Sequence, residues 1–156
     1  MLFKIKEGKH MVPTENIRIL AKQALYIILA HTVLLTINIY SHAKIDIFFS
    51  PGSNLFYSLF FCFVPLITVF LLPTKFARQA AVVMIGTLAA VLVYNIFARF
   101  TSISLITGRE VPLFWKILYE GSYGLLLISE VIGLWIVFKL LKEVHKQIDS
   151  QAVTKQ

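Results

Sequence analysis

The sequence predicts an all-α integral membrane protein, a four-helix bundle whose N- and C-termini both lie in the cytoplasm. Of the 156 residues, 58% are hydrophobic and 15% are charged, whereas soluble domains average about 45–50% apolar and about 25% charged residues. Four long apolar stretches run along the chain, each close to the roughly 20 residues that a membrane-spanning helix needs. Basic residues lie at the ends of these stretches, where they determine membrane orientation.

The spans are expected at about residues 20–40, 55–73, 80–100 and 119–140, which leaves no room for a separate soluble domain. Residues 1–156 are therefore predicted to form a single four-span membrane domain. The second span contains Pro65, whose missing N–H group predicts a kink. The fourth span is expected to continue into the cytoplasm over residues 138–148. The lysines of that segment suit a helix C-terminus and anionic lipid headgroups.

The distribution of basic residues predicts the orientation. Eleven of the 15 lysines and arginines fall in the N-terminal arm, the second connection and the C-terminal tail. The positive-inside rule places these segments in the cytoplasm. Ser41-His42-Ala43 resembles a signal-peptidase site, but the long preceding arm and apolar run favour a retained span. Chain size and short loops favour a bacterial inner membrane. The outer connection 101–118 is expected to be an interfacial or a binding element, with Trp115 as an interfacial anchor.

Glu130 is the only acidic residue in the interior of the four apolar stretches, since Glu120 lies at the outer end of the fourth. A charged side chain at the bilayer centre costs a few kcal/mol or more unless it is partnered. His31 lies midway along the first stretch, as Glu130 does along the fourth, so the two can pair if these helices touch. Two interpretations of Glu130 remain open: a buried structural hydrogen bond, or a coupling site for a proton or cation.

Small residues predict where helices pack closely. Gly86 and Ala90 in the third span, and Ser129 and Gly133 in the fourth, each have the four-residue spacing of a small-xxx-small contact. These four residues are expected at helix–helix interfaces.

A second set of polar side chains falls toward the outer ends of the spans. These residues form an outward-facing polar vestibule or, as we favour, serve as interfacial anchors and helix contacts. They are Asn38, Tyr57, Tyr94, Asn95 and Arg99.

The chain lacks the residue patterns of most chemistries. The single cysteine, Cys62, excludes an internal disulfide and a CxxC pair. The four histidines are spread over both membrane sides and one midplane position, so no metal site and no cofactor are expected. No catalytic motif is present, and an enzyme is not expected. The net charge of +7 does not indicate nucleic-acid binding, because the basic residues flank apolar segments.

These observations favour a non-enzymatic multipass protein that acts in the lipid bilayer through helix–helix contact. Its partner is expected to be another membrane protein, for which it is an accessory or immunity-type subunit, or a second copy of itself. The alternative is a small oligomeric transporter or channel in which Glu130 couples a proton or cation.

Overall fold

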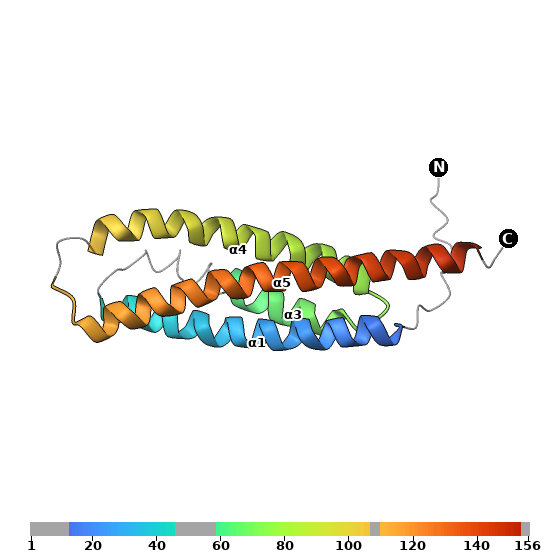
Figure 1. Ribbon diagram of the computed structural model, residues 1–156, viewed down its shortest axis with the longest axis horizontal. Helices are drawn as coiled ribbons and strands as arrows, with labels where there is room; N and C mark the ends of the chain where they lie inside the picture. Colours follow the sequence, from blue (N-terminus) through green and yellow to red (C-terminus); the bar gives the residue numbers. More distant parts are fainter. Residues whose placement is uncertain (1–12, 46–58, 107–109, 154–156) are drawn as a thin grey trace.

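Figure 1 shows the computed structural model, an elongated bundle of helices. It describes residues 13–45, 59–106 and 110–153, with side chains described for residues 13–45, 60–97 and 110–151. The elements are α1 (Glu15–Lys44), a π-helical turn η1 (Leu59–Phe63), α3 (Val64–Leu71), α4 (Ala77–Ile106) and α5 (Leu113–Val153). All regular structure in these ranges is helical, which confirms the predicted all-α class.

Three of the described helices are long and apolar enough to cross a membrane. They lie within α1, α4 and α5. The 30 residues of α1 extend for about 45 Å at the helical rise of about 1.5 Å per residue, which exceeds the roughly 30 Å of a bilayer core. The chain therefore has the character of an integral membrane protein, as predicted.

The second predicted span differs from the expectation of one continuous helix over residues 55–73. Its described part is a short apolar helix, Phe60–Leu71, which covers only about 18 Å. Residues 55–58 lie outside the described residues. Pro65 sits in the first turn of α3, directly after the π-helical turn. A proline supplies no N–H to the preceding turn, which explains why regular α-helical bonding starts only at Val64.

The helices form a ring in which α5 lies between α1 and α4, and α3 packs against α1 and α4 on the other side. Figure 1 shows that α1 begins and α5 ends at the same end of the bundle, next to the short connection from α3 to α4. Thr74 closes that connection, because its hydroxyl donates to the Leu71 carbonyl at 2.7 Å and accepts from the Phe76 N–H at 3.1 Å.

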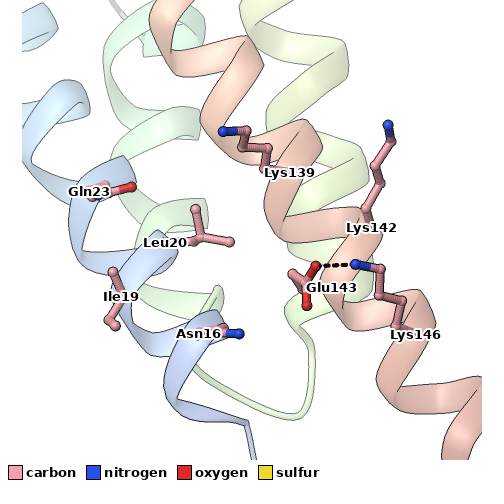
Figure 2. Close-up of a pocket in the computed structure, with 8 residues that line it drawn as sticks. All are labelled: Asn16, Ile19, Leu20, Gln23, Lys139, Lys142, Glu143 and Lys146. Carbon is pink, nitrogen blue, oxygen red and sulfur yellow. Dashed lines mark hydrogen bonds and ion pairs between the residues drawn. The ribbon is translucent and has the colours of Figure 1, made fainter.

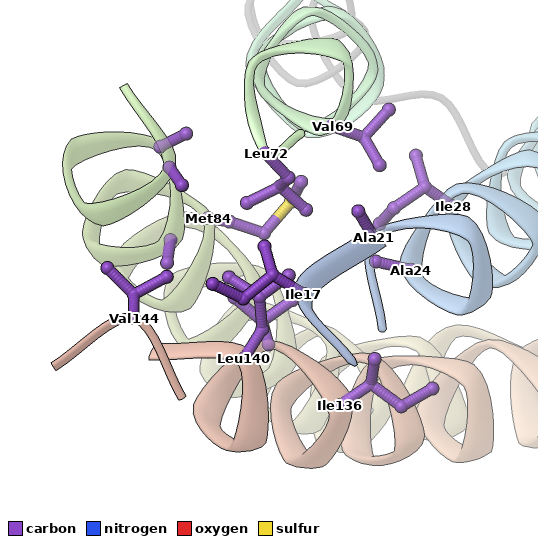
Figure 3. Close-up of a cluster of buried hydrophobic side chains, with 14 of the residues drawn as sticks. Ile17, Ala21, Ala24, Ile28, Val69, Leu72, Met84, Ile136, Leu140 and Val144 are labelled. Carbon is purple, nitrogen blue, oxygen red and sulfur yellow. The ribbon is translucent and has the colours of Figure 1, made fainter. Parts of the chain in front are cut away.

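An apolar core fills this same half of the bundle, where all four helices meet (Figure 3). Several contacts involve alanine, which lets helix backbones approach closely in a lipid environment. The fully buried members come from α1, α4, α5 and the C-cap of α3 and include Ile17, Ala24, Leu72, Ala81, Met84, Val137, Leu140 and Val144.

One stripe of buried residues runs along α1 and faces α5. Its side chains are apolar in the first half of the helix and polar in the second half. The buried positions Ile17, Ala21, Ala24 and Ile28 are apolar, and the next buried position is His31. Their alternating spacing of four and three residues is typical of left-handed helix packing. Beyond His31 the interface is largely polar, and this half of the bundle holds the candidate site.

Candidate functional site

Seven buried polar side chains join α5 to its two neighbours, and we call them the buried polar cluster. All are at most 8% exposed. The cluster consists of His31 and Asn38 on α1, Asn95 on α4, and Ser122, Tyr123, Ser129 and Glu130 on α5.

On one side of α5, three hydrogen bonds connect it to α1. The Nδ1 atom of His31 lies 3.0 Å from the hydroxyl oxygen of Ser129. The Asn38 amide donates to the Ser122 hydroxyl at 3.1 Å and approaches the Tyr119 carbonyl at 3.4 Å. These bonds satisfy polar groups that lipid cannot hydrogen-bond.

The Ser129 hydroxyl fixes the roles of the two His31 nitrogens. Ser129 donates its single hydrogen to the Leu126 carbonyl at 2.7 Å, so it accepts from His31. The imidazole hydrogen is then on Nδ1, and Nε2 carries a free lone pair. This Nε2 atom is buried and has no hydrogen-bond partner among the described residues.

On the other side of α5, Asn95 of α4 makes two contacts. Its side-chain amide donates to Oε1 of Glu130 at 2.5 Å, and its backbone carbonyl accepts from the Tyr123 hydroxyl. Glu130 is 0% exposed. Its second oxygen, Oε2, has no hydrogen-bond partner within the described part of the chain.

Sequence spacing explains why these side chains meet. Ser122 and Ser129 are seven residues apart on α5, as are Tyr123 and Glu130. Two helical turns contain about seven residues, so each pair projects from one face. The serine pair faces α1 and the Tyr123–Glu130 pair faces α4. This placement makes α5 the common partner of both helices.

The pairing of His31 with Glu130, which the sequence left as a hypothesis, is not present among the described contacts. The helices that carry them do touch, and His31 is level with Glu130 because it contacts the adjacent Ser129. However, Ser129 and Glu130 project about 100° apart around α5, and Glu130 is bonded to α4 instead. The carboxyl group is accommodated by the Asn95 amide. Nε2 of His31 and Oε2 of Glu130 each remain without a hydrogen-bond partner among the described residues.

The polar residues near the outer ends of the spans, for which a vestibule was the less favoured alternative, lie in separate places. Asn38 and Asn95 are buried in two different helix interfaces. Tyr94 is half-buried, with its ring centroid 5.1 Å from that of Phe61. Tyr57 and the side chain of Arg99 lie outside the described residues. Asn38 and Asn95 therefore serve as helix contacts rather than as parts of one vestibule.

The four small residues also separate. A Cβ atom at Gly133 would lie 3.2 Å from Leu88 and 3.5 Å from Ile27, so this glycine marks the place where α1, α4 and α5 meet. In contrast, Gly86 and Ala90 are exposed, and a Cβ atom at Gly86 would meet nothing within 4 Å. Gly86 and Ala90 therefore do not contact another helix of this chain, because they lie on the face of α4 that points away from the bundle.

The sequence interpretation missed Tyr123 and did not connect Asn95 with Glu130. One signal was available for each. Tyr123 lies two turns before Glu130, and Asn95 is the only asparagine in the third span. An antiparallel pairing of the last two spans would have placed this amide near the only intramembrane carboxyl group.

No group of three or more metal-binding side chains occurs among the described residues.

No family model matches this chain, and no curated protein or solved structure is significantly similar to it. The buried polar cluster and the outer surface of the bundle are therefore the features of this chain that bear on its function.

Proposed function

We propose that this chain is a small, non-enzymatic, multipass membrane protein that acts by helix–helix contact with another membrane protein. In this proposal it is an accessory subunit, or an immunity-type subunit that protects a membrane against a pore-forming toxin. The buried polar cluster holds the bundle together, and recognition takes place on the outer surface.

The outward face of α4 is the observation that carries this proposal. Five of its exposed residues follow a spacing of four, four, three and four, which places these five within one narrow stripe. Gly86 and Ala90 lie at the centre of this stripe, where the absence of large side chains lets a second helix approach closely. The stripe consists of Val82, Gly86, Ala90, Val93 and Phe97.

The location that we propose is a bacterial inner membrane with both termini in the cytoplasm. The first residues of α1 and the last residues of α5 lie at the same end of the bundle (Figure 1). Seven of the ten lysines and arginines within the described ranges belong to that end. A cysteine-accessibility map tests this orientation: Cys introduced at Asn16 should be labelled only from the cytoplasmic side, in a Cys62→Ser background.

Photo-cross-linking in intact membranes tests the partner. A photoreactive phenylalanine replaces Phe97 on α4 or, as the control, Tyr26 on α1, since these aromatic side chains are 70% and 68% exposed. We expect a stoichiometric adduct with another membrane protein from position 97 and none from position 26. Absence of any adduct at position 97 would count against the proposal.

A matched pair of substitutions tests the role of the small residues. Ala90→Ile should decrease the adduct at least several-fold, because the larger side chain holds a partner helix away. Ala30→Ile makes the same change at an exposed position of α1 and should leave the adduct unchanged. Equal adduct yields from both variants would show that Ala90 is not part of the partner contact.

A small oligomeric transporter or channel is the second candidate, and the unpartnered atoms of the cluster favour it. Oε2 of Glu130 and Nε2 of His31 are buried without hydrogen-bond partners in the described part of the chain, and such groups often mark proton or ion pathways in membranes. Purified protein in liposomes should then move protons, and Glu130→Gln should abolish the flux without loss of folding. Equal flux from the wild type and the variant would refute this candidate.

A further inference from the structure

A cleft of about 420 Å³ opens between the start of α1 and the last third of α5. In Figure 2, Asn16, Leu20 and Gln23 point from α1 toward α5, and the Lys139 side chain reaches toward α1. The lining is completed by Ile19, Lys142, Glu143 and Lys146. The cleft is therefore partly basic, partly neutral polar and, on the α1 side, partly apolar.

The charge balance of this lining is positive. The lining contains three lysines and one carboxylate. The carboxylate of Glu143 is ion-paired, because the Lys146 ammonium donates to it at 2.6 Å. The amides of Asn16 and Gln23 add donors opposite the lysines. Ammonium and amide N–H groups around one space are suited to the oxygens of a phosphate group.

The two tryptophans of the chain show where the cleft lies relative to the membrane. Trp115 and Trp135 are 20 residues apart on α5, which corresponds to about 30 Å, the thickness of a bilayer core. Each ring lies below a lysine ammonium: Lys44 is 5.9 Å from the Trp115 centroid, and Lys139 is 3.6 Å from the Trp135 centroid. Tryptophans with adjacent lysines are typical of the two membrane–water interfaces.

The cleft begins where the apolar core of the membrane ends. Lys139 lies one turn beyond Trp135, and Lys146 lies about 10 Å farther along the helix. The headgroup layer on each side of a bilayer is roughly 5–8 Å thick. The lysines of the cleft thus span the depth at which lipid phosphates are found, while Leu20 and Ile19 offer apolar contact to the glycerol and upper acyl carbons.

We propose that the cleft between α1 and α5 binds a phosphate group, presented as the headgroup of an anionic phospholipid. Lys139 and Lys146 hold the phosphate oxygens, Gln23 and Asn16 contribute neutral donors, and the lipid chains follow the apolar surface of α1. This inference is independent of the proposed partner-binding face, which lies on α4.

Lipid titration of the full-length protein in a mild detergent tests the proposal. The probes are dihexanoyl-phosphatidylglycerol, dihexanoyl-phosphatidylcholine and sodium phosphate, and the readout is the thermal unfolding midpoint at each concentration. We expect saturable stabilisation by the anionic lipid and none by the zwitterionic lipid. Stabilisation by sodium phosphate at similar concentrations would assign the cleft to a free phosphate instead of a lipid, and no saturable stabilisation by any probe would overturn the proposal.

A matched pair of double variants separates the cleft from general attraction to a basic surface. Lys139→Gln with Lys146→Gln removes two charges from the cleft and should weaken apparent lipid affinity by roughly ten- to thirty-fold. Lys75→Gln with Arg78→Gln removes two charges from the same end of the bundle outside the cleft and should weaken it less than about three-fold. Equal weakening by both would overturn the proposal.

A charge-conserving variant keeps the test independent of folding. Lys139→Arg with Lys146→Arg retains both cations and should retain lipid affinity within about three-fold. If this variant unfolds at the wild-type temperature without lipid but no longer responds to the anionic lipid, two cations at these positions are not sufficient for binding, and the proposed site is wrong. If the glutamine variant responds as strongly as the arginine variant, the two lysines do not bind the phosphate and the site assignment is wrong.

Discussion

Replacing Asn95 by leucine tests whether the intramembrane carboxyl group is held by a hydrogen bond. The Asn95 amide is the only described hydrogen-bond partner of the Glu130 side chain. Asn95→Leu has a similar volume and keeps the backbone carbonyl that accepts from Tyr123. The substitution therefore removes one bond and leaves a fully buried carboxyl group with neither oxygen partnered.

The expected loss of stability follows from this geometry. Leaving a buried polar group unsatisfied costs about 1–3 kcal/mol, whereas side-chain hydrogen bonds within membranes average about 0.6 kcal/mol in measured cycles. Because Glu130 is 0% exposed, we expect Asn95→Leu to cost about 2 kcal/mol. Glu130→Gln keeps an oxygen to accept from Asn95 and should cost less than about 1 kcal/mol.

A double-mutant cycle completes the test. Replacing both partners of a buried bond by apolar groups is nearly neutral, so Asn95→Leu with Glu130→Leu should be more stable than Asn95→Leu alone. Reversible unfolding in mixed micelles provides the free energies, with Asn16→Leu at an exposed position as the control for the residue change. Additive losses, or a loss from Glu130→Gln equal to that from Asn95→Leu, would refute the hydrogen-bond account.

Two further predictions concern the same interfaces. Tyr123→Phe removes only the hydroxyl that donates to the Asn95 carbonyl and should lower the free energy of unfolding by about 1 kcal/mol; Tyr26→Phe, at a side chain 68% exposed, should leave it unchanged, and equal effects in the same unfolding assay would contradict this. Gly133→Leu inserts a side chain where three helices meet and should cost about 3 kcal/mol or more, whereas Gly86→Leu at an exposed position should cost little. If Gly86→Leu destabilises the purified monomer as much, the described packing of α4 is wrong.

Much of the fold could be predicted because lipid leaves few alternatives. Backbone groups in lipid are satisfied within helices or closed barrels. Continuous apolar stretches of about 20 residues have the length of membrane helices rather than of barrel strands, so they predict the all-α class. The second span was harder. Its apolar length suggests one continuous crossing, but Pro65 and the π-helical turn before it shorten the regular helix. Hydropathy measures transfer into lipid, not the local bonding of each turn.

The site was predictable only in part. The depth of a residue in the membrane follows from its position along a span, whereas the neighbouring helix that its side chain faces does not. The sequence placed His31 and Glu130 at one level, and the His31–Ser129 contact is consistent with that level. It could not show which neighbour each faces. That depends on the order of helices around the ring, which no periodicity encodes. For the same reason the outward position of Gly86 followed only from the structure.

The central position of α5 has a consequence for how the chain is made. The five interhelical side-chain hydrogen bonds described above all end on this last helix. During synthesis from the N-terminus, His31, Asn38 and Asn95 enter the membrane before these partners exist. The hydrogen bonds that α1 and α4 make to α5 can therefore form only when translation is nearly complete. Chains that stop before Tyr119 carry His31, Asn38 and Asn95 without any of these five bonds.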